Sequence, residues 1–304
     1  MRLATTTGDF DEYTSDYLER IRYVQEAGFR YLDLSLYTVT EEDPLFGPGW
    51  RAYAELLGSY AEENGLHFVQ AHSPSTNNLN GESGYQDAVW KTIRSIEVCG
   101  VLGIPNIVVH AGWNSDIRDR DTWFAENKKF FSELFPAMEQ NHVNVLCENS
   151  TKANMRDMYY LFTGRDMADF VKYVDHPLFH ACWDTGHANI EGSQYQEILD
   201  LGKELYAIHY NDNRGQMDEH LIPFMGTLNH DEVMYALKKI GFQGPFTLEA
   251  GSALRGYRCW LGNRRGFEQD KRLAEPPLEL QQELEHFLCS AGKYILRMYG
   301  CLED

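Results

Sequence analysis

The sequence predicts an α/β fold in which eight parallel strands, each followed by a helix, close into a single (β/α)8 barrel. Three observations predict this fold. Short runs of apolar and β-branched residues alternate with longer amphipathic segments, eight such pairs fit into the 304 residues, and no shift in composition marks a linker. We therefore expect residues 1–304 to form one domain, since α/β barrels commonly reach this size as one unit.

The predicted strands are short runs rich in Val, Ile, Leu and aromatic residues. A barrel strand is buried on both faces, so a nearly continuous apolar run is the expected pattern. The eight runs are Leu3–Thr6, Tyr31–Leu36, His67–His72, Asn106–His110, Val143–Glu148, Phe179–Asp184, Leu205–His209 and Pro245–Glu249.

The segments between these runs have the periodicity of helices that cover a barrel. Three of them end at a glycine, Gly28, Gly65 or Gly241, the residue that most easily adopts the left-handed conformation terminating a helix. A doubly wound open sheet is the alternative, but no glycine-rich dinucleotide motif follows the first run. The predicted helices are Thr14–Ala27, Trp50–Asn64, Tyr85–Leu102, Thr122–Gln140, Asp166–Val174, Tyr195–Gly202, His230–Ile240 and Pro277–Tyr299.

Composition narrows the partners and the compartment. The 27 Lys and Arg against 46 Asp and Glu give a formal net charge of −19, which disfavours binding to nucleic acid, because that binding depends on basic side chains displacing counterions. The six cysteines form no Cys-x-x-Cys pair, so we expect no disulfide scaffold. No signal peptide or 18-residue apolar run is seen, so we expect a cytoplasmic protein without membrane contact. Composition does not decide whether the protein forms a homo-oligomer.

Six consecutive predicted strands end in a side chain that can bind a metal ion. The carboxyl ends of barrel strands meet at one mouth, where catalytic groups are found. Three carboxylates there would repel one another without a cation, so the pattern predicts a divalent metal site. Oxygen and imidazole ligands without a thiolate favour Mn²⁺, Mg²⁺, Co²⁺ or Zn²⁺. The strand ends are His72, His110, Glu148, Asp184, His209 and Glu249, and the following loops add His187, Asp218 and His220.

The set resembles the xylose isomerase-like TIM-barrel superfamily, which includes sugar isomerases, ketose 3-epimerases and endonuclease IV-type enzymes. The resemblance covers nearly the whole chain, and its specific part is Glu148, Asp184-Thr185-Gly186-His187, His209, Asp218-Glu219-His220-Leu221-Ile222-Pro223 and Glu249. It implies that Glu148, Asp184, His209 and Glu249 hold a single metal ion, with Mn²⁺ expected first. It also implies that Glu148 and Glu249 transfer protons and that His187 and Arg214 bind substrate.

We expect a metal-dependent isomerase or epimerase of a ketose, or of a related sugar or sugar phosphate, that transfers a proton through an enediolate. One alternative is a lyase or dehydratase of a keto-sugar or keto-inositol. A second is a binding protein that keeps the barrel with a vestigial site. A third is an endonuclease IV-type phosphodiesterase, because His72, His110, His187, Asp218 and His220 complete a set resembling the three-zinc site of that branch. We expect one bound metal ion, and the resemblance allows up to three.

A long loop, residues 251–277, is predicted after the eighth strand. It carries six basic side chains on an otherwise acidic protein, as a lid over the barrel mouth or a subunit contact would. These side chains are Arg255, Arg258, Arg264, Arg265, Lys271 and Arg272.

Overall fold

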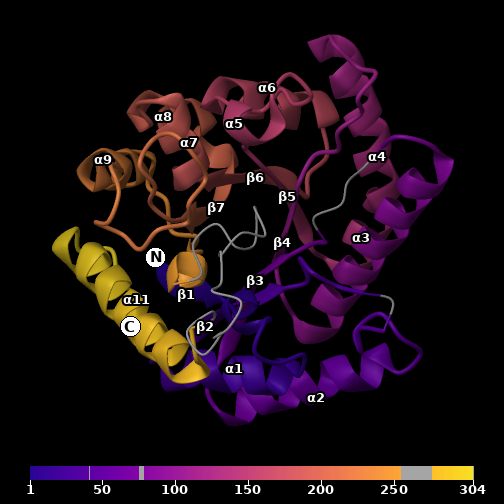
Figure 1. Cartoon of the computed structure of the whole chain (residues 1–304). Helices are drawn as coiled ribbons and strands as arrows, with labels where there is room; N and C mark the ends of the chain where they lie inside the picture. Colours follow the sequence, from indigo (N-terminus) through magenta and orange to yellow (C-terminus); the bar gives the residue numbers. More distant parts are fainter. Residues whose placement is uncertain (41, 75–78, 255–275, 304) are drawn as a thin grey trace, which may run out of the picture.

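Eight parallel strands close into a barrel in the computed structural model, which describes residues 1–40, 42–74, 79–254 and 276–303 (Figure 1). Each strand pairs with the next along the chain, and β1 also pairs with β8. The predicted (β/α)8 barrel is therefore confirmed. The strands are β1 (Arg2–Thr6), β2 (Tyr31–Ser35), β3 (His67–His72), β4 (Asn106–Val109), β5 (Asn144–Glu148), β6 (Phe179–Asp184), β7 (Leu205–Tyr210) and β8 (Pro245–Leu248).

The strand bounds agree with the predicted runs to within one residue at either end. Two of the small differences affect the site. His110 and Glu249 lie one residue beyond β4 and β8, so they begin the loops at the barrel mouth instead of ending the strands. Glu249 remains attached to the sheet, because its N–H donates to the carbonyl oxygen of Tyr210 at 3.2 Å.

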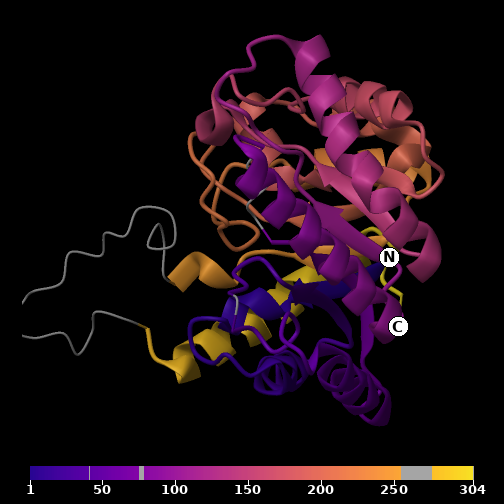
Figure 2. The ribbon, with the colours of Figure 1, turned by 90° about the vertical axis from the view of Figure 1, so that its right-hand side faces the viewer.

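The helices form the outer layer (Figures 1 and 2). The three helix-ending glycines adopt positive φ, at 95° for Gly28, 64° for Gly65 and 72° for Gly241, as the sequence predicts. The eight predicted helices are found as α1 (Tyr17–Glu26), α2 (Trp50–Glu63), α3 (Glu82–Leu102), α4 (Arg120–Asn141), α6 (Gly164–Val174), α8 (Tyr195–Leu201), α9 (His230–Ile240) and α11 (Leu278–Met298).

Short helices were not predicted from the sequence. Beyond the barrel mouth lie α5 (Lys152–Met155) and α7 (Thr185–Glu191), where the sequence suggested only loops. The side chain of Asp184 caps α7 by accepting the N–H of His187 at 2.6 Å. The residue predicted as a ligand therefore also begins a helix, which turns His187 back over the mouth.

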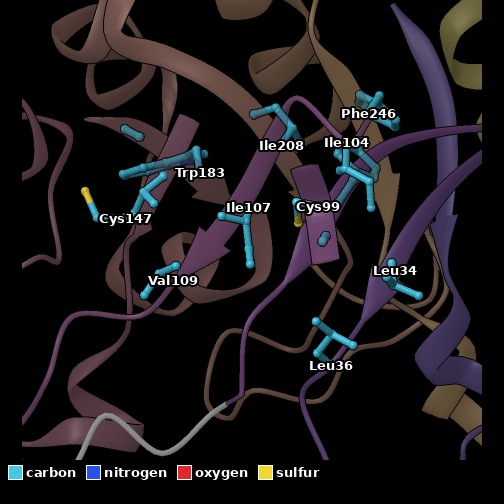
Figure 3. Close-up of a cluster of buried hydrophobic side chains, with 14 of the residues drawn as sticks. Leu34, Leu36, Cys99, Ile104, Ile107, Val109, Cys147, Trp183, Ile208 and Phe246 are labelled. Carbon is cyan, nitrogen blue, oxygen red and sulfur yellow. The ribbon is translucent and has the colours of Figure 1, made fainter. Parts of the chain in front are cut away.

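The hydrophobic core fills the space between the barrel and the helices (Figure 3). Fully buried side chains such as Trp183 of β6 and Phe246 of β8 point outward from the barrel into this layer. The described cysteines are all free of disulfide bonds. A smaller buried cluster packs separately from that layer. It takes one residue from each of four neighbouring strands, Val108, Leu146, Cys182 and Ala207.

Two further predictions concern membrane contact and the long loop after β8. None of the helices in the described ranges has the length and apolar character needed to cross a bilayer. Residues Gly251–Leu254 of the predicted long loop form a short 3-10 helix, η3, packed against α11. Residues 255–275 of that loop, with its six basic side chains, lie outside the described residues.

The burial of Glu285 in α11 can be tested through the pH dependence of the protein's stability. It is fully buried beside Thr5 and Asp9, and burial raises its pKa to about 7, against the opposing effect of these neighbours. Because the folded pKa lies above the unfolded value, ionisation costs nothing below about pH 4, and the cost grows to its full size above about pH 7. We expect Glu285→Gln to stabilise the protein at pH 8 by up to about 3 kcal/mol, but not at pH 4.5.

Urea unfolding at both pH values measures this difference. Glu133→Gln, at an exposed position of α4, is the control and should change stability little at either pH. The explanation fails if Glu285→Gln changes the free energy of unfolding equally at pH 4.5 and pH 8.

Candidate active site

Four of the predicted ligands meet at the barrel mouth. Glu148 ends β5, Asp184 ends β6, His209 lies near the end of β7, and Glu249 follows β8. Each offers one ligand atom, and these atoms all lie within 4.8 Å of one another. Nδ1 of His209 lies 2.9 Å from Oε1 of Glu148 and 3.4 Å from Oε1 of Glu249. The register of β6 and β7, which pairs Asp184 with His209, brings strand ends together in this way.

The five additional residues lie on two sides of this central group. On one side, Nε2 of His72 lies 3.5 Å and Nε2 of His110 lies 3.3 Å from the same oxygen, Oε2 of Glu148. On the other side, Asp218 lies between two histidines, with Oδ2 3.1 Å from Nε2 of His187 and Oδ1 3.2 Å from Nε2 of His220. The structure therefore brings all nine predicted ligand-type residues together, although their roles as ligands stay predictions.

Three of the histidines are held with Nε2 facing the carboxylates. Nδ1 of His72 lies 2.8 Å from the carbonyl oxygen of Ser73, and Nδ1 of His187 lies 2.9 Å from that of Asn149. Nδ1 of His220 likewise lies 2.7 Å from a main-chain oxygen, that of Glu249. A carbonyl can only accept, so each Nδ1 carries a proton. The lone pair of each neutral ring then points from Nε2, as in histidines that bind metals.

The charges of this group fit a bound cation. Oε2 of Glu148 and Oδ1 of Asp218 are buried and have no hydrogen-bond partner among the described residues. Burial opposes the protonated form of His187, but Asp184 and Asp218 outweigh it and raise its pKa to about 10. Without a metal ion, therefore, a proton on His187 stabilises these carboxylates. A divalent cation could supply the same positive charge.

The three central carboxyls differ in how readily they ionise. Burial alone would raise the pKa of Glu148, but the adjacent His209 and His110 lower it well below its usual range. Burial raises the pKa of Asp184 and of Glu249, although nearby histidines oppose the shift, and the charge of Glu148 adds to it. Carboxylates at this spacing repel one another, which is the condition that a cation relieves.

Several polar residues that support the ligands were not identified from the sequence. Asn211 donates to Oδ2 of Asp184 at 2.8 Å, and Asn149 accepts the N–H of Asp184 at 2.7 Å. The amide of Gln70 lies between His209 and Asp33, with Nε2 2.7 Å from Nε2 of His209 and 3.3 Å from Oδ1 of Asp33. The only signal is position, because Asn149 and Asn211 follow strand ends, while Gln70 and Asp33 lie inside strands.

Gln70 should affect metal binding through the ring of His209. Gln70→Met keeps the length of the side chain but removes the hydrogen bonds that hold the ring. Loss of such a contact typically weakens metal binding by about 10- to 100-fold, and we expect a change of this size by isothermal titration with Mn²⁺. Asn106→Leu, which removes a buried amide at the opposite end of the barrel, is the control. Unchanged affinity in Gln70→Met would show that the contact does not position the ligand.

Arg214 lies at the surface and pairs with an acidic neighbour. Its guanidinium pairs with Glu219, and 64% of its side chain is exposed. Among the described residues, none of its hydrogen bonds or ion pairs reaches the nine ligand-type residues. Its role in substrate binding stays a prediction.

A match to a family model along most of the chain defines the class of protein. The family model described as xylose isomerase-like TIM barrel matches residues 21–286, and the chain belongs to this family. A protein of Sinorhizobium fredii, named uncharacterized protein y4fM, is 30% identical over 166 residues, which cover 51% of this chain and 50% of that protein. The chain thus matches about half the length of this curated relative.

Solved structures of similar fold include sugar epimerases. A D-psicose 3-epimerase from Clostridium cellulolyticum, solved with D-tagatose, has a TM-score of 0.74 and 20% identity, covering 97% of this chain and 99% of its own. The IOLI protein, solved with a zinc atom, has a TM-score of 0.73 and 16% identity, covering 98% of this chain and 99% of its own. At these identities the likeness establishes the fold.

Proposed function

We propose that the chain is a metal-dependent isomerase or epimerase of a ketose or a related hydroxycarbonyl compound. The observation that carries the proposal is the central group, in which Glu148 and Glu249 both face Nδ1 of His209, with Asp184 within reach. These four residues would hold one divalent ion, with Mn²⁺ expected first. The D-psicose 3-epimerase of similar fold supports a sugar as the substrate.

Two glutamates at one site suit a reversible proton transfer. A bound divalent ion supplies Lewis acidity, which polarises a carbonyl and makes the neighbouring C–H acidic. One glutamate then removes that proton, and the other returns a proton to the opposite face in epimerisation or to the adjacent carbon in isomerisation. Burial of Glu148, Asp184 and His209 keeps water away from this transfer.

A panel of ketoses in deuterated water tests the proposal. Protein reconstituted with Mn²⁺ should convert at least one ketose and place deuterium at the reacting carbon. Loss of a substituent from the sugar would instead identify a lyase or dehydratase. Conversion that keeps the original hydrogen would exclude proton transfer between glutamates and indicate a hydride shift.

A phosphodiesterase is the second candidate. The observation that favours it is the pair of outer groups, in which His72 and His110 face Glu148 while His187 and His220 face Asp218. These groups could hold a second and a third ion. Three equivalents of bound zinc together with cleavage of an abasic-site duplex would establish it. The net charge of −19 opposes a DNA substrate.

A further inference from the structure

His209 differs from other histidines of the site in the ring nitrogen that faces the carboxylates. Its Nδ1 lies 2.9 Å from Oε1 of Glu148 and 3.4 Å from Oε1 of Glu249. The three histidines that main-chain oxygens hold in place present Nε2 instead. A metal ion needs a lone pair on the nitrogen that faces it, so a neutral His209 ring must then carry its proton on Nε2. That buried proton needs an acceptor.

Gln70 of β3 is the residue that can accept this proton. One atom of its side-chain amide, Nε2, lies 2.7 Å from Nε2 of His209 and 3.3 Å from Oδ1 of Asp33. An amide has a donor end and an acceptor end, and turning it by 180° exchanges the two. Oε1 of Gln70 is buried and has no hydrogen-bond partner among the described residues, so turning the amide breaks no hydrogen bond of this oxygen.

The atom of Gln70 that faces His209 decides which ring nitrogen is free. If Nε2 of Gln70 donates to the ring, the proton of a neutral His209 lies on Nδ1, which cannot then bind a metal ion. If Oε1 of Gln70 faces the ring, it accepts the proton of Nε2, and the lone pair of Nδ1 is free. Oε1 has two lone pairs, and it can also accept a proton from Asp33 if that carboxyl is protonated.

The surroundings of Asp33 favour a protonated carboxyl. The residue lies in β2 and is completely buried, and its Oδ2 has no hydrogen-bond partner among the described residues. Burial raises the pKa of Asp33, against the opposing effect of His209 and His72. A buried carboxylate without a paired charge is costly, whereas a protonated carboxyl can donate a hydrogen bond to Gln70.

We infer that Asp33 and Gln70 are positioning residues that set the tautomer of His209. Protonated Asp33 donates to Oε1 of Gln70, the same oxygen accepts the Nε2 proton of His209, and Nδ1 keeps its lone pair for a metal ion. The contacts run from β2 through β3 to β7, so three strands fix the state of one ring. The inference rests on the metal site proposed above and adds which nitrogen of His209 binds and what makes it available.

The direction of the hydrogen bond between Gln70 and His209 can be tested by isothermal titration with Mn²⁺. Gln70→Glu places a carboxylate where the amide lies, and a carboxylate can accept from the ring but cannot donate to it. We therefore expect Gln70→Glu to bind Mn²⁺ at least as tightly as the wild type. If Gln70 instead donates to His209, this variant should bind Mn²⁺ more weakly by about 10-fold or more.

A matched pair of variants tests the role of Asp33. Asp33→Asn keeps a donor for Oε1 of Gln70 and cannot ionise, so its Mn²⁺ affinity should stay close to that of the wild type. Asp33→Leu has a similar volume but no donor, and its affinity should fall by about 10-fold. Circular dichroism and thermal unfolding establish that each variant is folded.

Nitrogen-15 NMR of histidine-labelled protein loaded with Zn²⁺ shows directly which ring nitrogen of His209 carries the proton. We expect a proton on Nε2 and the metal ion on Nδ1. The inference is overturned by a proton on Nδ1, by weaker Mn²⁺ binding in Gln70→Glu, or by wild-type affinity in Asp33→Leu. A wild-type protein that binds no metal ion would overturn the proposed function as well, so the two failures can be told apart.

Discussion

Replacing Glu148 by glutamine is expected to lower ketose turnover by about 1,000-fold or more and to weaken Mn²⁺ binding severely. Glu148 contacts both sides of the site, because Oε1 faces His209 at 2.9 Å while Oε2 faces His72 and His110. Glutamine keeps the shape of the side chain but has no negative charge for a cation and cannot accept a substrate proton as a carboxylate does. Isothermal titration and steady-state turnover measure the two losses separately.

A second glutamate–histidine pair provides the control for this substitution. Oε2 of Glu204 lies 3.2 Å from Nδ1 of His180. His180 lies near the start of β6, at the end of the barrel away from the mouth. Glu204→Gln removes a similar carboxylate and should leave Mn²⁺ affinity and turnover near those of the wild type. Normal metal binding by Glu148→Gln would remove Glu148 from the proposed ligand set.

The largest loss of stability is expected from Gly164→Ala. Gly164 begins α6 against α8, and a Cβ there would overlap the main-chain carbonyl of Glu197. The carbonyl belongs to the backbone of α8, so the two helices would have to separate. Overpacking of this kind typically costs about 1–3 kcal/mol, and we expect the upper end of that range or more.

Urea unfolding measures the effect, with Gly49→Ala as the matched control. Gly49 precedes α2 with a negative φ of −96°, and nothing lies within 4 Å of a Cβ built there. That variant should change the free energy of unfolding by less than about 0.5 kcal/mol. Equal stabilities for the two variants would contradict the close packing of α6 on α8.

The strands and long helices could be predicted because each carries its own pattern. A barrel strand such as β6 is a short apolar run, and an outer helix such as α9 combines amphipathic spacing with a terminal glycine. The short helix α7 has too few residues for a periodic signal, and it depends on the cap that Asp184 supplies. The formation of α7 therefore depends on its position in the fold and could not be predicted from its local sequence pattern.

The ligand-type residues could be predicted from the strand ends, but the contacts that hold their side chains in place could not. The identity and position of Glu148 and His209 follow from the parallel barrel, which brings strand ends to one mouth. The orientation of the rings depends on main-chain oxygens, such as that of Ser73 for His72, which exist at every position and leave no signal in the sequence. Gln70 could not be found for a related reason, because a glutamine inside a strand is identified as a contact of His209 only in three dimensions.

Reconstitution with metal tests the central claim most directly. Protein stripped with a chelator is mixed with a responsive ketose in deuterated water, and Mn²⁺ is added in steps while deuterium incorporation is followed. The proposed site predicts no incorporation without metal and a rise that reaches its plateau at one ion per chain. Full exchange in the metal-free protein would contradict the claim that Glu148, Asp184, His209 and Glu249 act by holding a metal ion.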